Sequence, residues 1–332
     1  MERPIILVTG GLGGIGSYVA EQAFTELNAS KVIIVDNYYN SSIYRVHEIR
    51  RSICLDEMYP SWKDVLCVEE IDIGNYDLLL QAFRKHKPLY VFHLASTLTL
   101  DSKKFPRDAV RTNIVGTQNV IECCKETGVA QLVVASSASV FGDPDEIPTD
   151  ENHHYKNNKL LYGACKIANE VMLTSYAEEY SNFNFTATRF FNVYGPRASI
   201  NNVYTQIVQK WIKSIRDGDP IIIYGDGNQT MDLIYATDAA RSMILCIKNR
   251  VYRKNPMTFD GFFNIGTGRS ISVMELKDIL FCLMNKKVDI IIEEHDPNLV
   301  KKRQCNPALA KNLLSWEPLV SVEKGLKQCI MM

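Results

Sequence analysis

The chain has 332 residues, of which 46% are hydrophobic and 10% aromatic, so it can bury a large core as one large or two fused domains. Its 37 basic and 38 acidic residues give a net charge of -1, which excludes the basic surface needed to bind nucleic acid or an anionic membrane. This balance favours a small-molecule partner.

Five apolar, β-branched runs divide the first half of the chain into alternating strands and helices. The runs are PIILVTG, KVIIVD, VLCVEEID, LYVFHLAS and QLVVASS, and a segment with helical spacing follows each of them. This alternation predicts a parallel sheet with helices on both faces.

The second half of the chain, after Tyr155, alternates less regularly. It has a strand candidate in NFTATRFF, turn residues in YGDGNQT, and helix candidates near residues 273–283 and 307–314. The predicted fold class is α/β, a Rossmann-type doubly wound parallel sheet with a smaller, interleaved C-terminal substrate lobe. We predict an NAD-binding domain over residues 1–180, to which later segments contribute, and a lobe mainly over residues 181–332.

The stretch VTGGLGGIGS places glycines where the first strand gives way to the first helix. Glycines also serve an ordinary tight turn, but here they let a phosphate approach the free N–H groups of a helix start. The second strand ends in Asp36, about twenty residues after Gly16, where a carboxylate binds a ribose diol and repels the 2′-phosphate of NADP. The predicted cofactor is therefore NAD. The predicted NAD-binding residues here are Gly10, Gly13, Gly14, Ile15, Gly16, Asp36 and Asn37.

Tyr162 and Lys166 lie four residues apart in YGACKIANEVM, so their side chains share one face of a helix. The strand before them ends in the serine cluster of VVASSASVFG, at the sheet edge where open α/β folds bind ligands. A tyrosine and a lysine at this spacing also occur on solvated helix faces. The spacing alone therefore leaves their role open.

Ten motifs in a fixed order make nearly the whole chain resemble the extended short-chain dehydrogenase/reductase family. The resemblance is strongest to its NAD-dependent epimerases and dehydratases, which act on nucleotide sugars. The motifs are TGGLGGIGS, VDNYYNSS, IDIGNYD, FHLAS, NIVGTQNV, SSASVFG, YGACK, RFFNVYGPR, YGDGNQTMDLIYATDAA and FNIGTGRSISVMEL.

The resemblance implies three catalytic residues. Tyr162 is the acid/base, Lys166 lowers its pKa and binds the ribose, and Ser137 orients the substrate oxygen. Bringing a tyrosine pKa from about 10 to about 7 takes roughly 4 kcal/mol, which the ammonium and the positively charged nicotinamide supply together.

The resemblance also implies further cofactor contacts. Asp72 and Ile73 flank the adenine, Leu94 and Ala95 line the cofactor path, and Asn113 holds the active-site helix through a buried polar contact. A simple cap or turn is the alternative role for Asp72 and Asn113.

The residues after Ser137 indicate the reaction. Dehydratases and decarboxylases of the family carry an acidic residue there, whereas this chain has Ala138 and Ser139. The resemblance therefore favours epimerisation, at carbon 4 of a nucleotide sugar, by transient oxidation and hydride return. The alternatives are a net oxidoreductase or dehydratase, on a nucleotide sugar or a non-nucleotide substrate, and a non-catalytic NAD-binding regulator.

The substrate side departs from the family pattern. Asn192 matches the asparagine that contacts the nucleotide diphosphate in the family, and Arg197 could help to bind it. Two arginines that the family pattern leads us to expect are replaced, one by Met231 and one at or beside Asp296. Cations at neighbouring positions could compensate or could be solvated surface charges. They are Arg269, Lys301, Lys302 and Arg303.

Assembly and location follow from the remaining features. The nine cysteines lack paired spacings, and His153 and His154 lie in a polar loop, so we expect reduced thiols and no metal site. No apolar run reaches about 18 residues, and no signal peptide is found, so we expect a cytoplasmic protein. The segments AVRTNIVGTQNVIECC and LLYGACKIANEVMLTSYAEEY carry more apolar residues than one core face needs. In the family such helices form a dimeric four-helix bundle, so we expect a homodimer.

Overall fold

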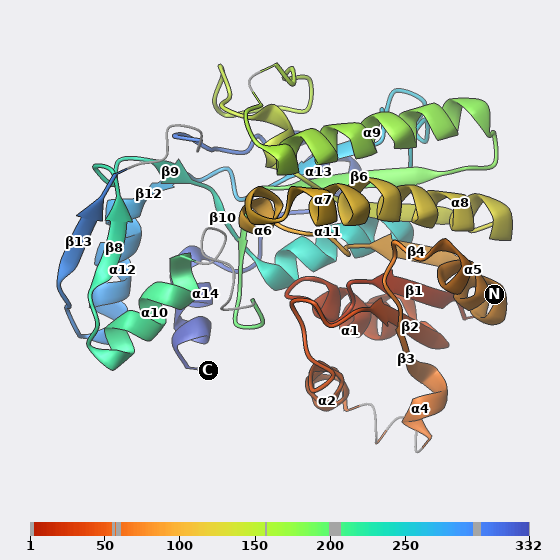
Figure 1. The fold of residues 1–332 in the computed structure, drawn as a ribbon, viewed down its shortest axis with the longest axis horizontal. Coiled ribbons are helices and arrows are strands. Elements are labelled where there is room, and N and C mark those ends of the chain that lie inside the picture. Colours follow the sequence, from red (N-terminus) through yellow and green to blue (C-terminus); the bar gives the residue numbers. More distant parts are fainter. Residues whose placement is uncertain are drawn as a thin grey trace.

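A seven-stranded parallel sheet forms the centre of the protein, as a computed structural model shows (Figure 1). The structure describes residues 3–54, 57, 61–156, 158–198, 207–294 and 300–331. The strand order is β11-β6-β5-β4-β1-β2-β3. The strands are β1 (Ile5–Thr9), β2 (Lys31–Asp36), β3 (Leu66–Glu70), β4 (Tyr90–His93), β5 (Gln131–Ser137), β6 (Phe185–Phe190) and β11 (Phe262–Ile265). The predicted doubly wound α/β fold is confirmed.

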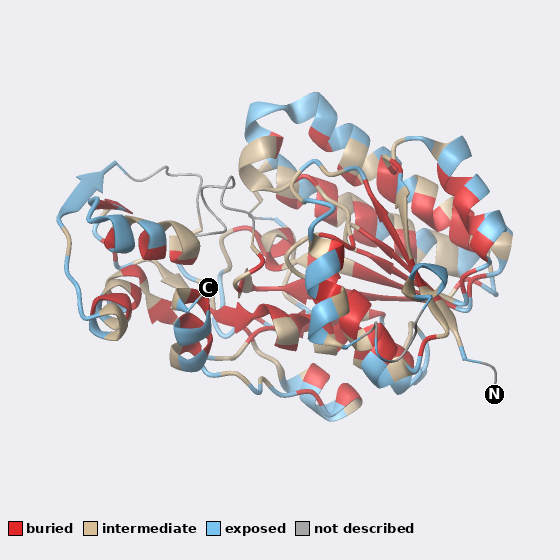
Figure 2. Cartoon of the chain, turned by 90° about the horizontal axis from the view of Figure 1, so that it is seen from below, coloured by how far each residue is buried: buried red, intermediate tan, exposed pale blue. Residues whose placement is uncertain are grey.

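Helices cover both faces of this sheet because its strands are apolar on both sides. Along β1, Ile6 and Val8 join the core beneath α1 (Gly16–Leu27) and α11 (Ala236–Lys248), whereas Leu7 joins the core beneath α5 (Tyr76–His86). The second layer continues with α8 (Thr117–Thr127) and α9 (Leu161–Glu179), and the first with α13 (Ala308–Leu314). Figure 2 shows the buried strands between the two layers.

Shorter elements connect the strands and helices of the sheet. They are α2 (Arg45–Ser52), α4 (Trp62–Val65), α6 (Thr99–Lys104), α7 (Pro106–Val110), the π-helical turn η1 (Arg111–Gly116) and the 3₁₀ turn η2 (Ala138–Phe141).

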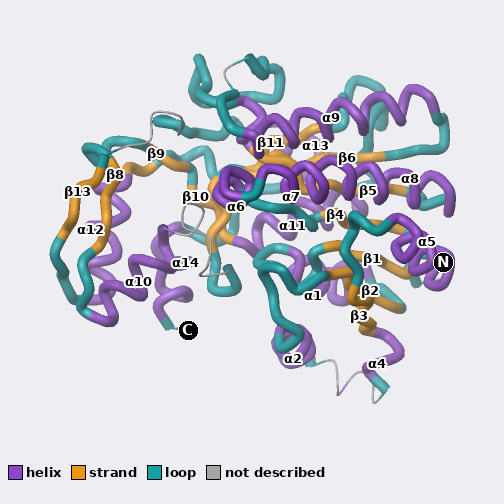
Figure 3. Tube along the Cα trace, viewed as in Figure 1, coloured by secondary structure: helices purple, strands orange, loops and turns teal. Residues whose placement is uncertain are grey.

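A smaller lobe with its own apolar core lies at one end of the molecule (Figure 3). The helices of this lobe are α10 (Ile207–Asp217), α12 (Val273–Met284) and α14 (Val322–Ile330). Its strands are β8 (Ile221–Tyr224) paired with β13 (Ile290–Glu293), and β9 (Thr230–Met231) paired with β12 (Ile271–Ser272). The pair β7 (Asn192–Tyr194) and β10 (Leu233–Tyr235) connects the lobe to the sheet.

The lobe and the sheet are interleaved along the chain. After residue 180, β6 and β11 join the large sheet, and α11 and α13 pack on one of its faces. The chain then ends in the lobe with α14. The domain boundary near residue 180 remains a prediction. Among the described residues, no helix combines the length and apolar character needed to cross a bilayer.

Candidate active site

A cavity of about 940 Å³ lies at the carboxyl edge of the sheet and extends into the smaller lobe. Its lining includes Gly10 after β1, Asp36 at the end of β2, Leu94 after β4 and Ser137 at the end of β5. This is the edge at which open α/β sheets bind ligands, and the volume is at the upper end of known ligand sites.

The glycine-rich loop forms one wall of this cavity. Gly10 has a φ of +65° and donates its N–H to the carbonyl of Val35 at 2.8 Å. A Cβ on Gly16 would lie 2.2 Å from the Gly10 carbonyl oxygen, so the loop folds tightly onto the start of α1. The helix has no acidic residue in its first turn and no side-chain cap. The N–H groups of Gly14, Ile15 and Gly16 donate to no backbone carbonyl of the described residues, so they are available to a phosphate.

Asp36 is buried and lines the cavity beside this loop. Its carboxylate accepts hydrogen bonds from Leu12 N at 3.0 Å, Tyr38 N at 3.0 Å and Ser41 Oγ at 2.8 Å. A carboxylate has about four acceptor positions, so it can hold the loop and still accept a ribose hydroxyl.

Most of the other predicted cofactor residues line the same cavity, but two do not. Those lining it are Gly13, Gly14, Ile15, Gly16, Asn37, Ile73, Leu94 and Ala95. Asp72 instead accepts the N–H of Gly74 at 2.8 Å and pairs with Arg111 at 2.9 Å, which makes it a turn residue. Its prediction as an adenine contact is therefore not supported by its position.

Asn113 is also outside the cavity lining, and it holds the loop after β4. Its Oδ1 accepts the N–H of Thr97 at 2.8 Å, and its Nδ2 donates to the Thr97 carbonyl at 2.9 Å. The connection to α9 is indirect: the Asn113 carbonyl accepts from Thr117, whose hydroxyl accepts from Asn169 of α9. The predicted buried polar contact between Asn113 and the active-site helix is therefore replaced by a connection through Thr117.

Ser137, Tyr162 and Lys166 converge on the cavity from β5 and α9. The Lys166 ammonium donates to the carbonyl of Ala135 at 2.8 Å and lies 5.6 Å from the centre of the Tyr162 ring. The end of β5 therefore fixes the lysine beside the tyrosine.

Burial dominates the ionisation of both groups. It raises the pKa of Tyr162 to about 12, although the hydroxyls of Ser137 and Ser96 and the charge of Arg303 act to lower it. It lowers the pKa of Lys166 to about 8. The protein alone therefore keeps Tyr162 protonated, and the predicted pKa near 7 requires the positive charge that oxidised NAD supplies when bound.

A buried ion pair between α9 and β6, which was not predicted from the sequence, lies next to this group. Glu170 of α9 pairs with Arg189 of β6 at 2.9 Å and accepts from Ser136 Oγ at 2.6 Å and Tyr155 Oη at 2.9 Å. The Ser136 hydroxyl is thereby committed to Glu170. This leaves Ser137 as the neighbouring serine that accompanies Tyr162.

The two predicted diphosphate ligands lie in different places. Asn192 lines the cavity, and its buried Oδ1 has no hydrogen-bond partner in the described part of the chain. Arg197 pairs with Glu21 of α1 at 2.5 Å, stacks 4.2 Å from the centre of the Tyr18 ring, and is not among the lining residues. Because the Arg197 guanidinium is paired with the Glu21 carboxylate, we do not retain Arg197 as a substrate ligand.

Of the cations that the sequence offered as replacements for the missing arginines, one lines the cavity and the others do not. Met231 lines the cavity, whereas Asp296 lies outside the described residues. Arg269 pairs with Glu323, and Lys301 and Lys302 are exposed and do not line the cavity. Of these four cations, Arg303 alone reaches the lining.

Two further lysines of the lining, Lys210 and Lys213, come from α10 and were missed. Val208, Trp211, Ile212 and Ile215 are buried at helical spacing, a periodicity that could have revealed this helix.

The sequence profile of the NAD dependent epimerase/dehydratase family matches residues 6–266. The chain belongs to this family. A UDP-glucuronate 4-epimerase from Thermodesulfobacterium geofontis is 31% identical over 98% of this chain and 94% of its own length. A UDP-glucuronic acid decarboxylase of Xenopus tropicalis is 26% identical over 99% of this chain and 72% of its own. The structure of UDP-glucose 4-epimerase from Thermotoga maritima with UDP-glucose has a TM-score of 0.86 at 28% identity, covering 98% of this chain and 97% of that one.

Membership in the epimerase/dehydratase family confirms that this protein is an NAD-dependent enzyme. The residues present fit NAD on structural grounds. Gly10, Gly13, Gly14 and Gly16 present backbone without side chains to the cavity, and Asp36 also lines it. These residues would hold the pyrophosphate and a ribose.

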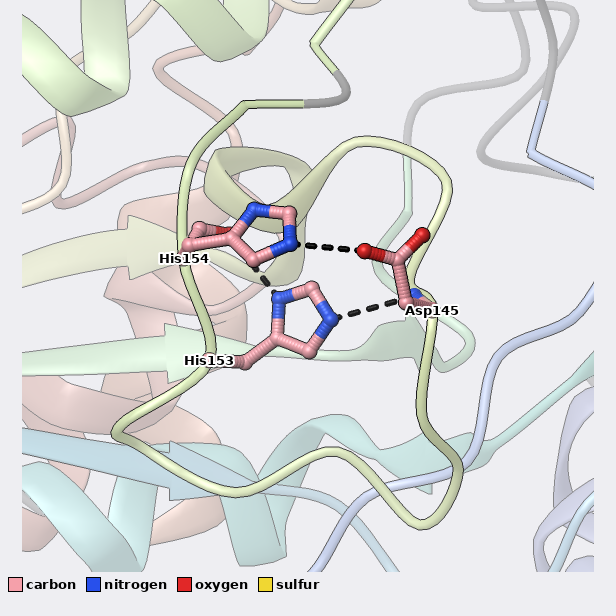
Figure 4. Close-up of side chains that lie close together, drawn as sticks. All are labelled: Asp145, His153 and His154. Atoms are coloured by element: carbon pink, nitrogen blue, oxygen red, sulfur yellow. Dashed lines mark hydrogen bonds and ion pairs between the residues drawn. The ribbon is translucent and has the colours of Figure 1, made fainter.

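Asp145, His153 and His154 form a cluster in the loop that precedes α9 (Figure 4). The N–H of Asp145 donates to His153 Nε2 at 3.1 Å, and that of Lys156 donates to His154 Nδ1 at 3.1 Å. His154 Nε2 therefore carries the proton that Asp145 accepts at 2.6 Å. His153 Nδ1 lies 2.9 Å from the carbonyl oxygen of His154. All four ring nitrogens therefore form hydrogen bonds within the loop, and a metal ion would have to break these bonds.

Proposed function

We propose that this enzyme is a nucleotide-sugar epimerase that inverts carbon 4 through a transient keto-sugar. The observation that carries the proposal is the convergence of Ser137, Tyr162 and Lys166 on a cavity that also contains the NAD-binding loop. The relatives named above act on UDP-sugars, which supports this substrate class.

Each residue of the site has a separate role in this reaction. NAD, when bound, supplies a reversible acceptor for the hydride of carbon 4. Tyr162 takes the proton of the carbon-4 hydroxyl and later returns it, while Ser137 hydrogen bonds to the same oxygen. Lys166, fixed by the Ala135 carbonyl, stabilises the tyrosinate that accepts this proton.

The lining of the cavity favours epimerisation over dehydration or decarboxylation. Its carboxylates, among the described residues, are Asp36 beside the NAD loop and Asp108 of α7. Ala138 and Ser139 follow Ser137, so no acid follows the substrate-orienting hydroxyl to remove a second proton. Return of the hydride to the other face of the ketone is the chemistry that needs no further base.

Lys210 and Asn192 are the proposed ligands of the nucleotide diphosphate. Lys210 lines the cavity, and the structure gives it no ion pair among the described residues. Burial lowers its pKa, a cost that an anionic ligand would relieve. Among the described residues, the buried Oδ1 of Asn192 has no hydrogen-bond partner. The amide can therefore turn its Nδ2 donor, which a diphosphate requires, toward the ligand.

The experiment that tests this function is chromatography with mass spectrometry of the enzyme with NAD and a panel of UDP-, GDP- and dTDP-sugars. We expect a new peak of unchanged mass from at least one of them. Loss of water or carbon dioxide would contradict the assignment, and loss of two hydrogens would indicate the net oxidoreductase.

We also propose a homodimer that works in the cytoplasm. Exposed apolar side chains on neighbouring helices support the dimer: Val110 of α7, Val115 of η1 and Val171 of α9. Nine free thiols support a reducing compartment. Sedimentation of wild type and Val171→Asp tests the dimer, because a charge on this face should shift the mass toward a monomer.

A further inference from the structure

Five basic side chains line the cavity, and most of them already have partners. The five are Arg111, Lys166, Lys210, Lys213 and Arg303. Arg111 pairs with Asp72, Lys213 with Asp217, and Lys166 donates to a carbonyl. Lys210 and Arg303 form no ion pair or side-chain hydrogen bond with the described residues. The cavity therefore offers two positive charges that have no ion-pair partner in the part of the chain that the structure describes.

Arg303 is held in place by the backbone around it. Its N–H donates to Thr230 Oγ1 at 3.4 Å, and its carbonyl accepts from Ser270 Oγ at 3.0 Å. The next residues are fixed as well, since Gln304 accepts from Thr149 N at 2.9 Å and Cys305 donates to Asp232 at 3.0 Å. The guanidinium is thus presented to the cavity from a preorganised segment.

Arg303 lines the same cavity as Ser137 and Tyr162. It is one of the groups whose charge lowers the pKa of Tyr162, the proposed acid/base. Burial lowers the pKa of Arg303 to about 10, so it stays charged at neutral pH, although Asp143 acts in the opposite direction. Asp143 is not among the residues that line the cavity. A partly buried cation facing a ligand site is costly unless the ligand supplies its counterion.

We propose that Arg303 binds a carboxylate on the sugar, so that the substrate is a nucleotide-linked uronic acid. This inference rests on the proposed function, in which Lys210 and Asn192 bind the diphosphate and Tyr162 faces the sugar. A guanidinium fork matches a carboxylate in two parallel hydrogen bonds, which a neutral hydroxymethyl group cannot supply. Lys210 and Arg303, the two lining cations without an ion pair among the described residues, then match the two anionic groups of such a substrate.

The test compares two substrates that share a nucleotide diphosphate and differ in the carboxylate. Titration calorimetry of NAD-loaded enzyme with UDP-glucuronate and with UDP-glucose measures binding without relying on turnover. We expect wild type to bind UDP-glucuronate more tightly. Arg303→Gln should weaken UDP-glucuronate by about 30-fold and UDP-glucose by less than about twofold, and Arg303→Lys should fall between. Arg269→Gln, an arginine paired on the surface, is the matched control and should change neither.

Three results would overturn the proposal. Equal weakening of both sugars by Arg303→Gln would make Arg303 a diphosphate ligand. Tighter binding of UDP-glucose than UDP-glucuronate by wild type would exclude a uronate even if the variant does not fold. If NAD binds but neither sugar nor UDP does, the proposed function itself fails, and this inference fails with it.

Discussion

The two ends of the cavity are built in different ways. At the cofactor end, the loops after β1, β2 and β4 supply backbone and short polar groups to a wall held by consecutive strands. At the substrate end, the walls come from α10, β9 and the segment around Arg303, which are distant in sequence. The residues for binding NAD therefore come from local motifs, whereas those proposed to bind the substrate are brought together by long-range packing.

Tyr162→Phe should separate the two ends most strongly. It removes the proposed acid/base and leaves the NAD wall intact, so turnover should fall by about 10³-fold while NAD affinity stays within about twofold. Turnover of the sugar identified by the panel, with NAD titrations, measures both. Tyr180→Phe is the control, because this residue follows α9 and does not line the cavity. A parallel loss of NAD binding would contradict the assigned role.

The pH dependence of stability tests how rigidly the cofactor end is built. His93 lies buried between Thr9 and Thr117, whose hydroxyl oxygens are 2.7 Å and 3.0 Å from its ring nitrogens. Burial lowers its pKa to about 3. Below about pH 6.5, His93 is protonated in the unfolded chain but stays neutral in the folded protein. The free energy of unfolding therefore falls as the pH falls.

Between pH 7 and pH 5 this histidine should cost the folded protein about 2 kcal/mol of unfolding free energy. Urea unfolding at the two pH values measures the loss. His93→Asn removes the titrating ring, so its own decrease should be smaller by that amount. An equal decrease in both proteins would show that His93 is not held neutral.

Gly14→Ala should affect the cofactor end alone. A Cβ there would come no closer than 3.4 Å to Ala198, so the fold can accept it, but the methyl group would enter the space where a phosphate approaches. We expect NAD affinity to fall about tenfold with an unchanged melting temperature, as measured by calorimetry and thermal unfolding.

Gly16→Ala is the matched variant, because its Cβ would lie 2.2 Å from the Gly10 carbonyl oxygen. It should lower stability by about 1–3 kcal/mol as well as NAD affinity. Unchanged NAD affinity in Gly14→Ala would mean that the cofactor does not approach this loop.

Lys210→Met should affect the substrate end alone. Removing this ammonium, which has no ion pair among the described residues, should weaken the binding of UDP by about fivefold and leave NAD affinity unchanged, both measured by titration. Lys248→Met, which removes a surface lysine paired with Glu26, is the control. Unaltered UDP affinity would remove Lys210 from the proposed diphosphate site.

The sequence predicts the sheet and the cofactor wall because both depend on local pattern. Strand periodicity, the glycine spacing and the four-residue step from Tyr162 to Lys166 each involve neighbours in the chain. Arg197 was mispredicted because its partner, Glu21, is 176 residues away, and only the fold brings the two together. Lys210 and the ion pair of Glu170 with Arg189 escaped prediction for the same reason.

The most direct test of the central claim is to follow UDP-glucuronate deuterated at carbon 4 through the reaction with NAD-loaded enzyme. If the hydride leaves carbon 4 and returns to it, the product is a carbon-4 epimer that keeps the deuterium and the full mass, with no accumulation of reduced NAD. A product that has lost the label to the solvent, or that has lost carbon dioxide or water, would contradict the account.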